Sequence, residues 1–145
     1  MAAASKPALT KKYYTAAEAN ATLPLVRSIV RDITELATEL RDRQDRLARL
    51  RPRHKSVIPE AHREELQQAE AEFERDQERL QGYEQELKRL GVQLKDYFTG
   101  LIDFPCLMDG REVYLCWRYG EPEVAYWHEL NAGFQGRQKL KTSKK

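Results

Sequence analysis

The sequence predicts an α+β fold, in which a long antiparallel two-helix coiled-coil hairpin packs against a small three-stranded antiparallel β-meander. Two stretches, 23–50 and 66–90, carry apolar residues at alternating steps of three and four, which is the spacing of paired helices. The connection between them is about eight residues long and favours an antiparallel pair. Between 101 and 129 the apolar spacing changes to that of strands separated by turns.

The first helical stretch begins with a capping box, in which the side chains of Thr15 and Glu18 each bond the other residue's backbone N–H. We expect a short helix there, and Pro24, which has no N–H to donate, in the first turn of the next helix. The apolar stripe of that next helix consists of Val26, Ile29, Ile33, Leu36, Leu40, Leu47 and Leu50, widened in its first half by Leu25, Val30 and Ala37. Pro52 and Pro59 break the helical pattern.

The second helical stretch repeats the same spacing, and Gly91 ends it. Its stripe consists of Leu66, Ala69, Phe73, Leu80, Tyr83, Leu87 and Leu90. Each stripe contains one charged residue, Arg43 in the first and Asp76 in the second. Because their charges are opposite, we expect these two residues to meet in the seam, the line of contact between the two helices. Their pairing would fix the register of one helix against the other at some cost in folding stability.

The width of the stripes divides the helices into two parts. A wide stripe must face two neighbours, so we expect 23–40 and 80–94 to form a body with the β-unit. Residues 41–79 then project as a two-helix arm, on the order of 20 Å long. Residues 41–55 carry a charge balance of +5 and residues 60–79 one of −5. Antiparallel packing lays these segments side by side, so their charges neutralise each other within the chain.

The β-unit should contain three strands at roughly 101–107, 112–118 and 124–129. Asp109-Gly110 is a typical two-residue hairpin turn between the first two strands, and Gly120-Glu121-Pro122 supplies the second turn.

The hairpin turn also predicts a register, because it makes the numbers of paired residues sum to 219 and so places Asp103 opposite Cys116. One face then holds Ile102, Phe104, Cys106, Val113, Leu115 and Trp117, and the other holds Asp103, Tyr114, Cys116 and Arg118. The first face should pack on the helices. Cys106 and Cys116 lie on opposite faces, which excludes a disulfide between them.

A length of 145 residues fits one domain, placed at 13–140 with the helical hairpin at 23–91 and the β-unit at 100–130. The tails, 1–12 and 141–145, are small, polar and basic, and the first is expected to be disordered. The net charge of +2 is too small to indicate a nucleic-acid partner. No apolar run is long enough for a membrane span, and the start lacks a signal-peptide core, so we expect a cytoplasmic protein.

The residues best suited to chemistry lie in the β-unit. Asp103, Cys116 and His128 suit either of two roles. They could form a catalytic set of a nucleophile, a general base and a residue that orients the base, or they could be three ligands of a metal ion. Their grouping depends on the third strand, because one register brings His128 to the face of Asp103 and a one-residue slip brings Glu129 there instead. No metal-type pair such as CxxC or HxxxH occurs, so we assign no metal ligands and leave catalytic residues and cofactor open.

Two other interpretations of the same segment stand beside this one. The run Trp127-His128-Glu129, with Arg137 after the glycine-rich turn 132–136, could build a ligand pocket with aromatic walls and polar ends. Alternatively, Trp117 and Trp127 belong to the packed core of a small sheet.

A set of short motifs spans both ends of the chain. They are Tyr14-Thr15, Glu18-Ala19-Asn20 and Leu23-Pro24, then Asp103-Phe104-Pro105, Gly110-Arg111, Val113, Leu115-Cys116-Trp117, Gly120-Glu121, Trp127-His128, Gly133-Phe134 and Gly136-Arg137. Together they resemble domain-of-unknown-function family 2203, a group of small, uncharacterised, mainly prokaryotic proteins, over roughly 13–140. The resemblance implies the architecture and no reaction. It also implies which positions to test first: Asp103, Arg111, Cys116, Trp117, Glu121, Trp127, His128 and Arg137.

These observations favour a non-enzymatic interaction module that docks on a protein partner or on a second copy of itself as a homodimer. The alternative is a small-molecule or metal-binding protein, an enzyme included, that uses the region of Asp103, Cys116 and His128. A third hypothesis is an RNA-associated factor, with phosphate contacts from the basic loop Arg51, Arg53, His54 and Lys55. That loop has no aromatic residue for base stacking, so we regard nucleic acid as an improbable partner.

Overall fold

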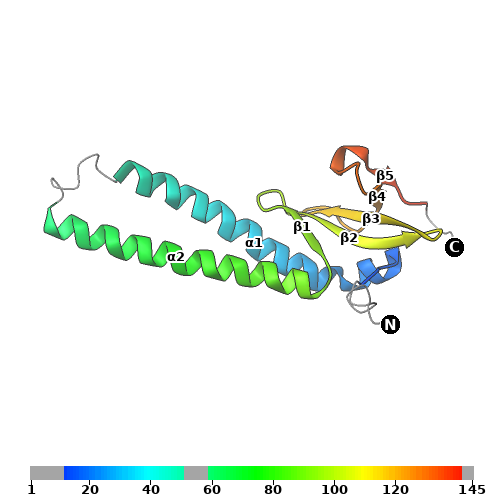
Figure 1. The fold of residues 1–145 in the computed structure, drawn as a ribbon, viewed down its shortest axis with the longest axis horizontal. Coiled ribbons are helices and arrows are strands. Elements are labelled where there is room, and N and C mark those ends of the chain that lie inside the picture. The colour runs from blue at the N-terminus through cyan, green and yellow to red at the C-terminus, as the bar shows by residue number, and fades with distance from the viewer. Residues whose placement is uncertain (1–11, 51–58, 142–145) are drawn as a thin grey trace, which may run out of the picture.

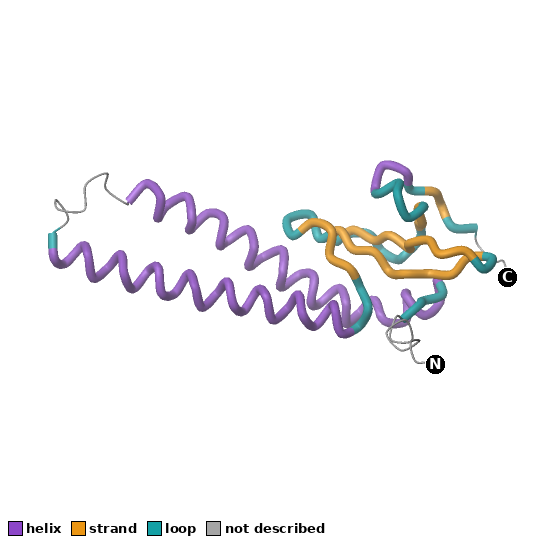
Figure 2. The backbone as a smooth tube through the Cα atoms, in the orientation of Figure 1, coloured by secondary structure: helices purple, strands orange, loops and turns teal. Residues whose placement is uncertain are grey.

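The computed structural model describes residues 12–50 and 59–141, which form an α+β fold, as predicted. In chain order the elements are α1 (Ala16–Leu50), α2 (Glu60–Arg89), β1 (Gln93–Asp96), β2 (Leu101–Met108), β3 (Arg111–Arg118), β4 (Tyr126–His128), a 3₁₀ turn (Phe134–Gly136) and β5 (Gln138–Lys139). The two helices lie side by side and run in opposite directions (Figure 1). The strands gather at one end of the helices, which continue well beyond the sheet (Figure 2).

Helix α1 runs without interruption through Pro24, so the expectation of a separate short helix before this residue is wrong. The capping box is confirmed: the Glu18 N–H donates to Thr15 Oγ1, and the Thr15 N–H donates to Glu18 Oε1. The first turns are also held by the sheet side of the molecule. Asn20 Nδ2 donates to the Val124 carbonyl at 3.1 Å, and the Val124 N–H donates to Asn20 Oδ1 at 2.7 Å. These bonds stabilise the turns that the missing N–H of proline weakens.

The sheet has five antiparallel strands in the order β1-β2-β3-β4-β5, so the prediction of three strands is wrong. Two strands, β1 and β5, were not predicted, and they are four and two residues long. Both are short and largely polar, and neither shows the apolar alternation by which a strand is recognised. They are strands only because β2 and β4 offer them free backbone edges.

The predicted register of the β2–β3 hairpin is confirmed, with Asp103 opposite Cys116. At the turn, Asp109 and Gly110 have φ angles of 54° and 79°, the left-handed values that a two-residue hairpin turn of this type requires. Strand β4 pairs with β3 in the first of the two registers considered, which brings His128 to the face of Asp103.

One face of the sheet, which we call the inner face, packs on α1. It contributes Ile102, Phe104, Cys106, Val113, Leu115 and Trp117 to the core, and α1 contributes Ala19, Leu23, Val26, Ile29, Val30 and Ile33. Trp117 is fully buried there, and its Nε1–H donates to the Glu121 carbonyl at 3.1 Å. This side chain is therefore part of the core, as the simpler interpretation of the tryptophans held.

Along the arm, α1 is better buried than α2. Leu36, Ala37, Leu40 and Leu47 of α1 are buried, whereas Leu87 is the one buried residue among those of α2 and it lies at the sheet end. Leu25 and Leu50 were predicted in the apolar stripe of α1 but are 53% and 69% exposed. Leu25 lies a full 100° around the helix from buried Val26, and Leu50 is the last residue of α1, so the neighbouring elements cover neither.

The two charged residues of the stripes meet, as predicted: Arg43 Nη2 lies 2.5 Å from Asp76 Oδ2, and their side chains are 20% and 22% exposed. Asp76 also accepts from Arg79 at 3.0 Å. Within the described residues, Arg43 Nε is buried without an acceptor, which is part of the cost of placing a charge in the seam.

The basic loop Arg51, Arg53, His54 and Lys55 lies outside the described residues, as do the predicted tails apart from Lys12 and Lys141. Among the helices of the described ranges, none combines the length and the apolar character needed to cross a membrane.

We predict that Asp76→Leu lowers the free energy of unfolding by about 1–2 kcal/mol at pH 7, because it strands Arg43 in the seam. The double variant Arg43→Leu/Asp76→Leu should regain the stability of the parent or exceed it.

The two arginines lower the pKa of Asp76 below its ordinary 3.8, so the advantage of the parent over Asp76→Leu should be present above pH 4 and fade as the pH falls below that. Urea unfolding across pH measures both effects. An Asp76→Leu variant as stable as the parent at pH 7 would contradict the role given to this pair.

Candidate functional site

The face of the sheet turned away from α1, which we call the outer face, holds a buried polar cluster. Asp103 on β2, Cys116 on β3 and His128 on β4 are 2%, 0% and 2% exposed. The Asp103 carboxylate, the Cys116 Sγ and the His128 ring nitrogen all lie within 4.8 Å of one another. The structure therefore brings together the three residues that the sequence analysis grouped for catalysis or metal binding.

Strand order explains how these residues reach one another. Cys116 faces Asp103 directly across the β2–β3 ladder, but His128 lies two strands away from Asp103. Strands two apart are separated by about 10 Å, so the His128 side chain must lean across β3 to place Nε2 3.1 Å from Asp103 Oδ1. The imidazole thereby covers part of β3, which helps to bury Cys116 on the face turned away from α1.

The hydrogen bonds of His128 fix where its protons lie. Nδ1 lies 2.7 Å from the backbone carbonyl of Glu129, which can only accept, so Nδ1 carries a hydrogen. Nε2 faces the Asp103 carboxyl, and a hydrogen bond there requires one proton between the two groups. The pair therefore holds one proton, as imidazolium with carboxylate or as imidazole with carboxylic acid.

Burial disfavours the charged forms of Asp103 and Cys116. Burial raises the pKa of Asp103, against the opposing effects of His128 and Lys95. Burial and the charge of Asp103 raise the pKa of Cys116 to about 12, so its thiol is protonated at neutral pH. A catalytic cysteine needs the opposite environment, with a lowered pKa and access for substrate. A catalytic cysteine also needs a histidine bonded to its sulfur, whereas Nε2 of His128 is hydrogen-bonded to Asp103.

The C-terminal segment lies beside this cluster. The 3₁₀ turn and β5, orange and red in Figure 1, lie on the opposite side of the sheet from the blue start of α1. Arg137 donates to Glu121 Oε2 at 2.7 Å, and its guanidinium stands 4.0 Å from the ring centroid of Tyr126 and 4.6 Å from that of Phe134. We call Arg137 with its ion-pair partner Glu121 the Arg137–Glu121 clasp. Because Tyr126 is the β4 partner of Cys116, this clasp lies next to the cluster on the outer face.

The remaining predicted site residues lie elsewhere. Trp117 points into the core on the inner face, and Trp127 also alternates to that side, half-buried. Arg111 forms an exposed ion pair with Glu129 and lies 5.9 Å from the Trp127 ring. The structure does not bring these residues to Asp103.

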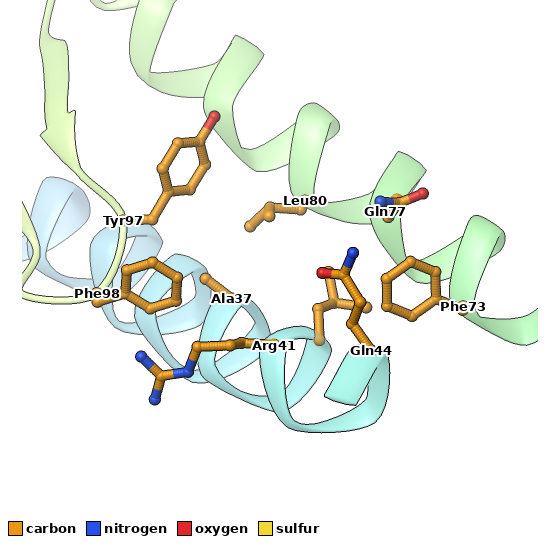
Figure 3. Close-up of a pocket in the computed structure, with 9 residues that line it drawn as sticks. Ala37, Arg41, Gln44, Phe73, Gln77, Leu80, Tyr97 and Phe98 are labelled. Carbon is orange, nitrogen blue, oxygen red and sulfur yellow. The ribbon is translucent and has the colours of Figure 1, made fainter. Parts of the chain in front are cut away.

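A second feature is an open groove at the base of the arm, which we call the arm-base groove (Figure 3). It measures about 250 Å³ and is lined by Ala37, Leu40, Arg41, Gln44, Phe73, Gln77, Leu80, Tyr97 and Phe98. Figure 3 shows side chains of α1 and α2 facing one another across it, with Tyr97 and Phe98 at one end. Phe98 is 47% exposed, and the Arg41 guanidinium lies 4.6 Å from its ring.

The arm-base groove was not predicted from the sequence. The signal available was the aromatic pair Tyr97-Phe98 just before Gly100, in a segment too short and too polar to be recognised as part of the sheet. Only the pairing of β1 with β2 carries this aromatic pair to the helices.

We predict that Cys116 resists alkylation in the native protein. In a Cys106→Ala variant, where Cys116 is the remaining thiol, iodoacetamide at pH 8 should leave the folded protein unmodified, since a thiol with a pKa of about 12 and no exposure offers no thiolate. Unfolding in urea should restore full labelling, which mass spectrometry detects. Native labelling at the rate of a free cysteine would contradict the buried arrangement of the cluster.

Comparison with known proteins adds one match. A family model described as an uncharacterized conserved protein, DUF2203, matches residues 12–140, which is nearly the whole chain. No curated protein matches the sequence, and no solved structure does. The match agrees with the resemblance carried by the motifs of the β-unit and of the first helix. The chain belongs to the DUF2203 family.

Proposed function

We propose that this protein is a non-catalytic interaction module that associates with a second copy of itself through the arm. The observation that carries the proposal is the arm-base groove, an apolar opening between two long helices with the exposed ring of Phe98 beside it. Grooves between neighbouring helices are typical docking sites for a further helix. The cluster on the outer face supports a binding role over a catalytic one, because the Cys116 thiol is protonated and buried.

The unfinished burial of α2 supports the same interpretation. Its apolar residues Leu66, Phe73, Leu80 and Tyr83 are only half-buried, although they occupy the repeat of a helix seam. The regular spacing supports coiled-coil packing of the arm, and a coiled coil with half-covered seam positions gains hydrophobic stabilisation when another helix covers them.

The charges carried by the arm support its association with an identical copy. The arm carries both signs of charge, with a balance of −5 over residues 60–79 and Arg41, Arg46 and Arg49 on α1. A surface that carries both signs can complement its own copy.

We predict that the purified chain, whose mass is 17.0 kDa, approaches twice that mass with rising concentration in light scattering. Phe98→Asp should weaken this association at least about tenfold, because it places a charge at the end of an apolar interface.

The matched control is Leu130→Asp, since Leu130 is similarly exposed, at 51%, but lies outside the groove. It should associate like the parent. A parent chain that stays at 17.0 kDa at every concentration would refute self-association, and equal weakening by both substitutions would refute the groove as its site.

A further inference from the structure

The polar cluster of the outer face has a use that the interaction module does not require. We propose that Asp103, Cys116 and His128 hold one divalent metal ion of the zinc class. The donors are one carboxylate oxygen, one sulfur and one imidazole nitrogen, supplied by three adjacent strands and converging within 4.8 Å.

The donor set selects the class of ion. Zinc accepts thiolate, imidazole and carboxylate ligands together, usually in a tetrahedral arrangement. Calcium and magnesium take oxygen ligands, so the Cys116 sulfur argues against both. Three protein ligands leave the fourth tetrahedral position for a water molecule.

The distances fit such an ion with small movements. Metal–ligand bonds of about 2.0–2.3 Å at tetrahedral angles place neighbouring ligand atoms roughly 3.4–3.7 Å apart. His128 Nε2 and Asp103 Oδ1 are 3.1 Å apart, close to that spacing. Since all three donor atoms lie within 4.8 Å of one another, the remaining separations need to shorten by at most about 1.1–1.4 Å.

The second bond of His128 provides the support that metal-binding imidazoles require. Its Nδ1–H donates to the Glu129 carbonyl at 2.7 Å, which fixes the ring and leaves Nε2 directed into the cluster. Ligand histidines almost always donate their other N–H to a carbonyl or carboxylate in this way. The orientation of the ring therefore suits an ion at Nε2.

Charge balance also suits a buried ion. The charges of a divalent ion, one carboxylate, one thiolate and one neutral imidazole sum to zero. The loaded site therefore places no net charge among Asp103, Cys116 and His128, which are almost completely buried. Loading would replace the thiol hydrogen of Cys116 and the single proton held between His128 and Asp103. Binding should therefore release about two protons per ion.

The test uses the full chain, purified without chelator, stripped and reloaded with Zn²⁺, then with Co²⁺ as a spectroscopic probe. We expect one equivalent of zinc to survive dialysis, and the cobalt form to show a thiolate-to-cobalt charge-transfer band with the intense visible bands of tetrahedral cobalt. Calorimetry in buffers of different ionisation enthalpy should count about two protons released for each zinc ion bound.

Cys116→Ala should weaken zinc binding at least about 100-fold and abolish the charge-transfer band, since even the loss of a supporting outer residue costs 10- to 100-fold. Cys106→Ala is the matched control, because Cys106 is also buried but lies on the inner face, and it should leave zinc affinity and the cobalt spectrum unchanged. Asp103→Asn is a second, shape-preserving variant, with circular dichroism and melting to verify the fold; it should also weaken zinc.

Absence of retained zinc, cobalt spectra without a thiolate band, or zinc affinity that Cys116→Ala leaves unchanged would each overturn the site. The parent cobalt spectrum needs no variant, so the proposal stays falsifiable if a substitution prevents folding. Self-association is measured separately by light scattering, so failure of either proposal is recognised independently of the other.

Discussion

The two-residue turn at Asp109-Gly110 sets the register of β2 against β3, and that register assigns every side chain of both strands to a face. Side chains alternate strictly along a strand, so a slip of one residue would turn over the faces of one strand relative to the other. Asp103 and Cys116 would then lie on opposite faces, and either Phe104 or Trp117 would leave the core. The body, the polar cluster and the line of contact with α1 therefore depend on one short turn whose residues accept left-handed φ angles.

The sheet is buried on both faces, for two different reasons. The inner face is apolar and is covered by the first half of α1, which gives ordinary hydrophobic stabilisation. The outer face is turned away from α1. There the imidazole of His128 leans over β3, and the Arg137–Glu121 clasp lies alongside on Tyr126 and Phe134. Burying Asp103 is tolerated because His128 satisfies it, and a buried carboxyl without such a partner would cost several kcal/mol.

The body and the arm differ in how completely their side chains are covered. In the body, α1, α2 and the sheet share one core, and several residues of the sheet have no exposed surface. Along the arm each helix has a single neighbour, and the seam of α2 stays half-exposed. An interaction surface belongs on such a segment, whereas a rigid set of three donor atoms belongs on paired strands. The proposed association site and the proposed ion site accordingly lie in different parts of the fold.

The features that depend on local spacing could be predicted from the order of the residues alone. The three-four repeat gave two long helices, the capping box of Thr15 and Glu18 marked where the first begins, and the Asp109-Gly110 turn gave the β2–β3 register together with the two faces. The pairing of Arg43 with Asp76 followed from the same repeat, because each stripe contains one charged residue and a half-buried charge is costly without a partner of opposite sign.

The remaining features depend on contacts between segments that are distant in the chain. The polar strand β1 and the two-residue strand β5 exist because a neighbouring backbone edge completes their hydrogen bonds, which no local pattern records. The register of β4 selected His128 over Glu129 for the outer face, and α1 passed through Pro24 because Asn20 and Val124 hold it from outside. Such choices are made by partners distant in sequence, whose contacts outweigh the local preferences of the chain.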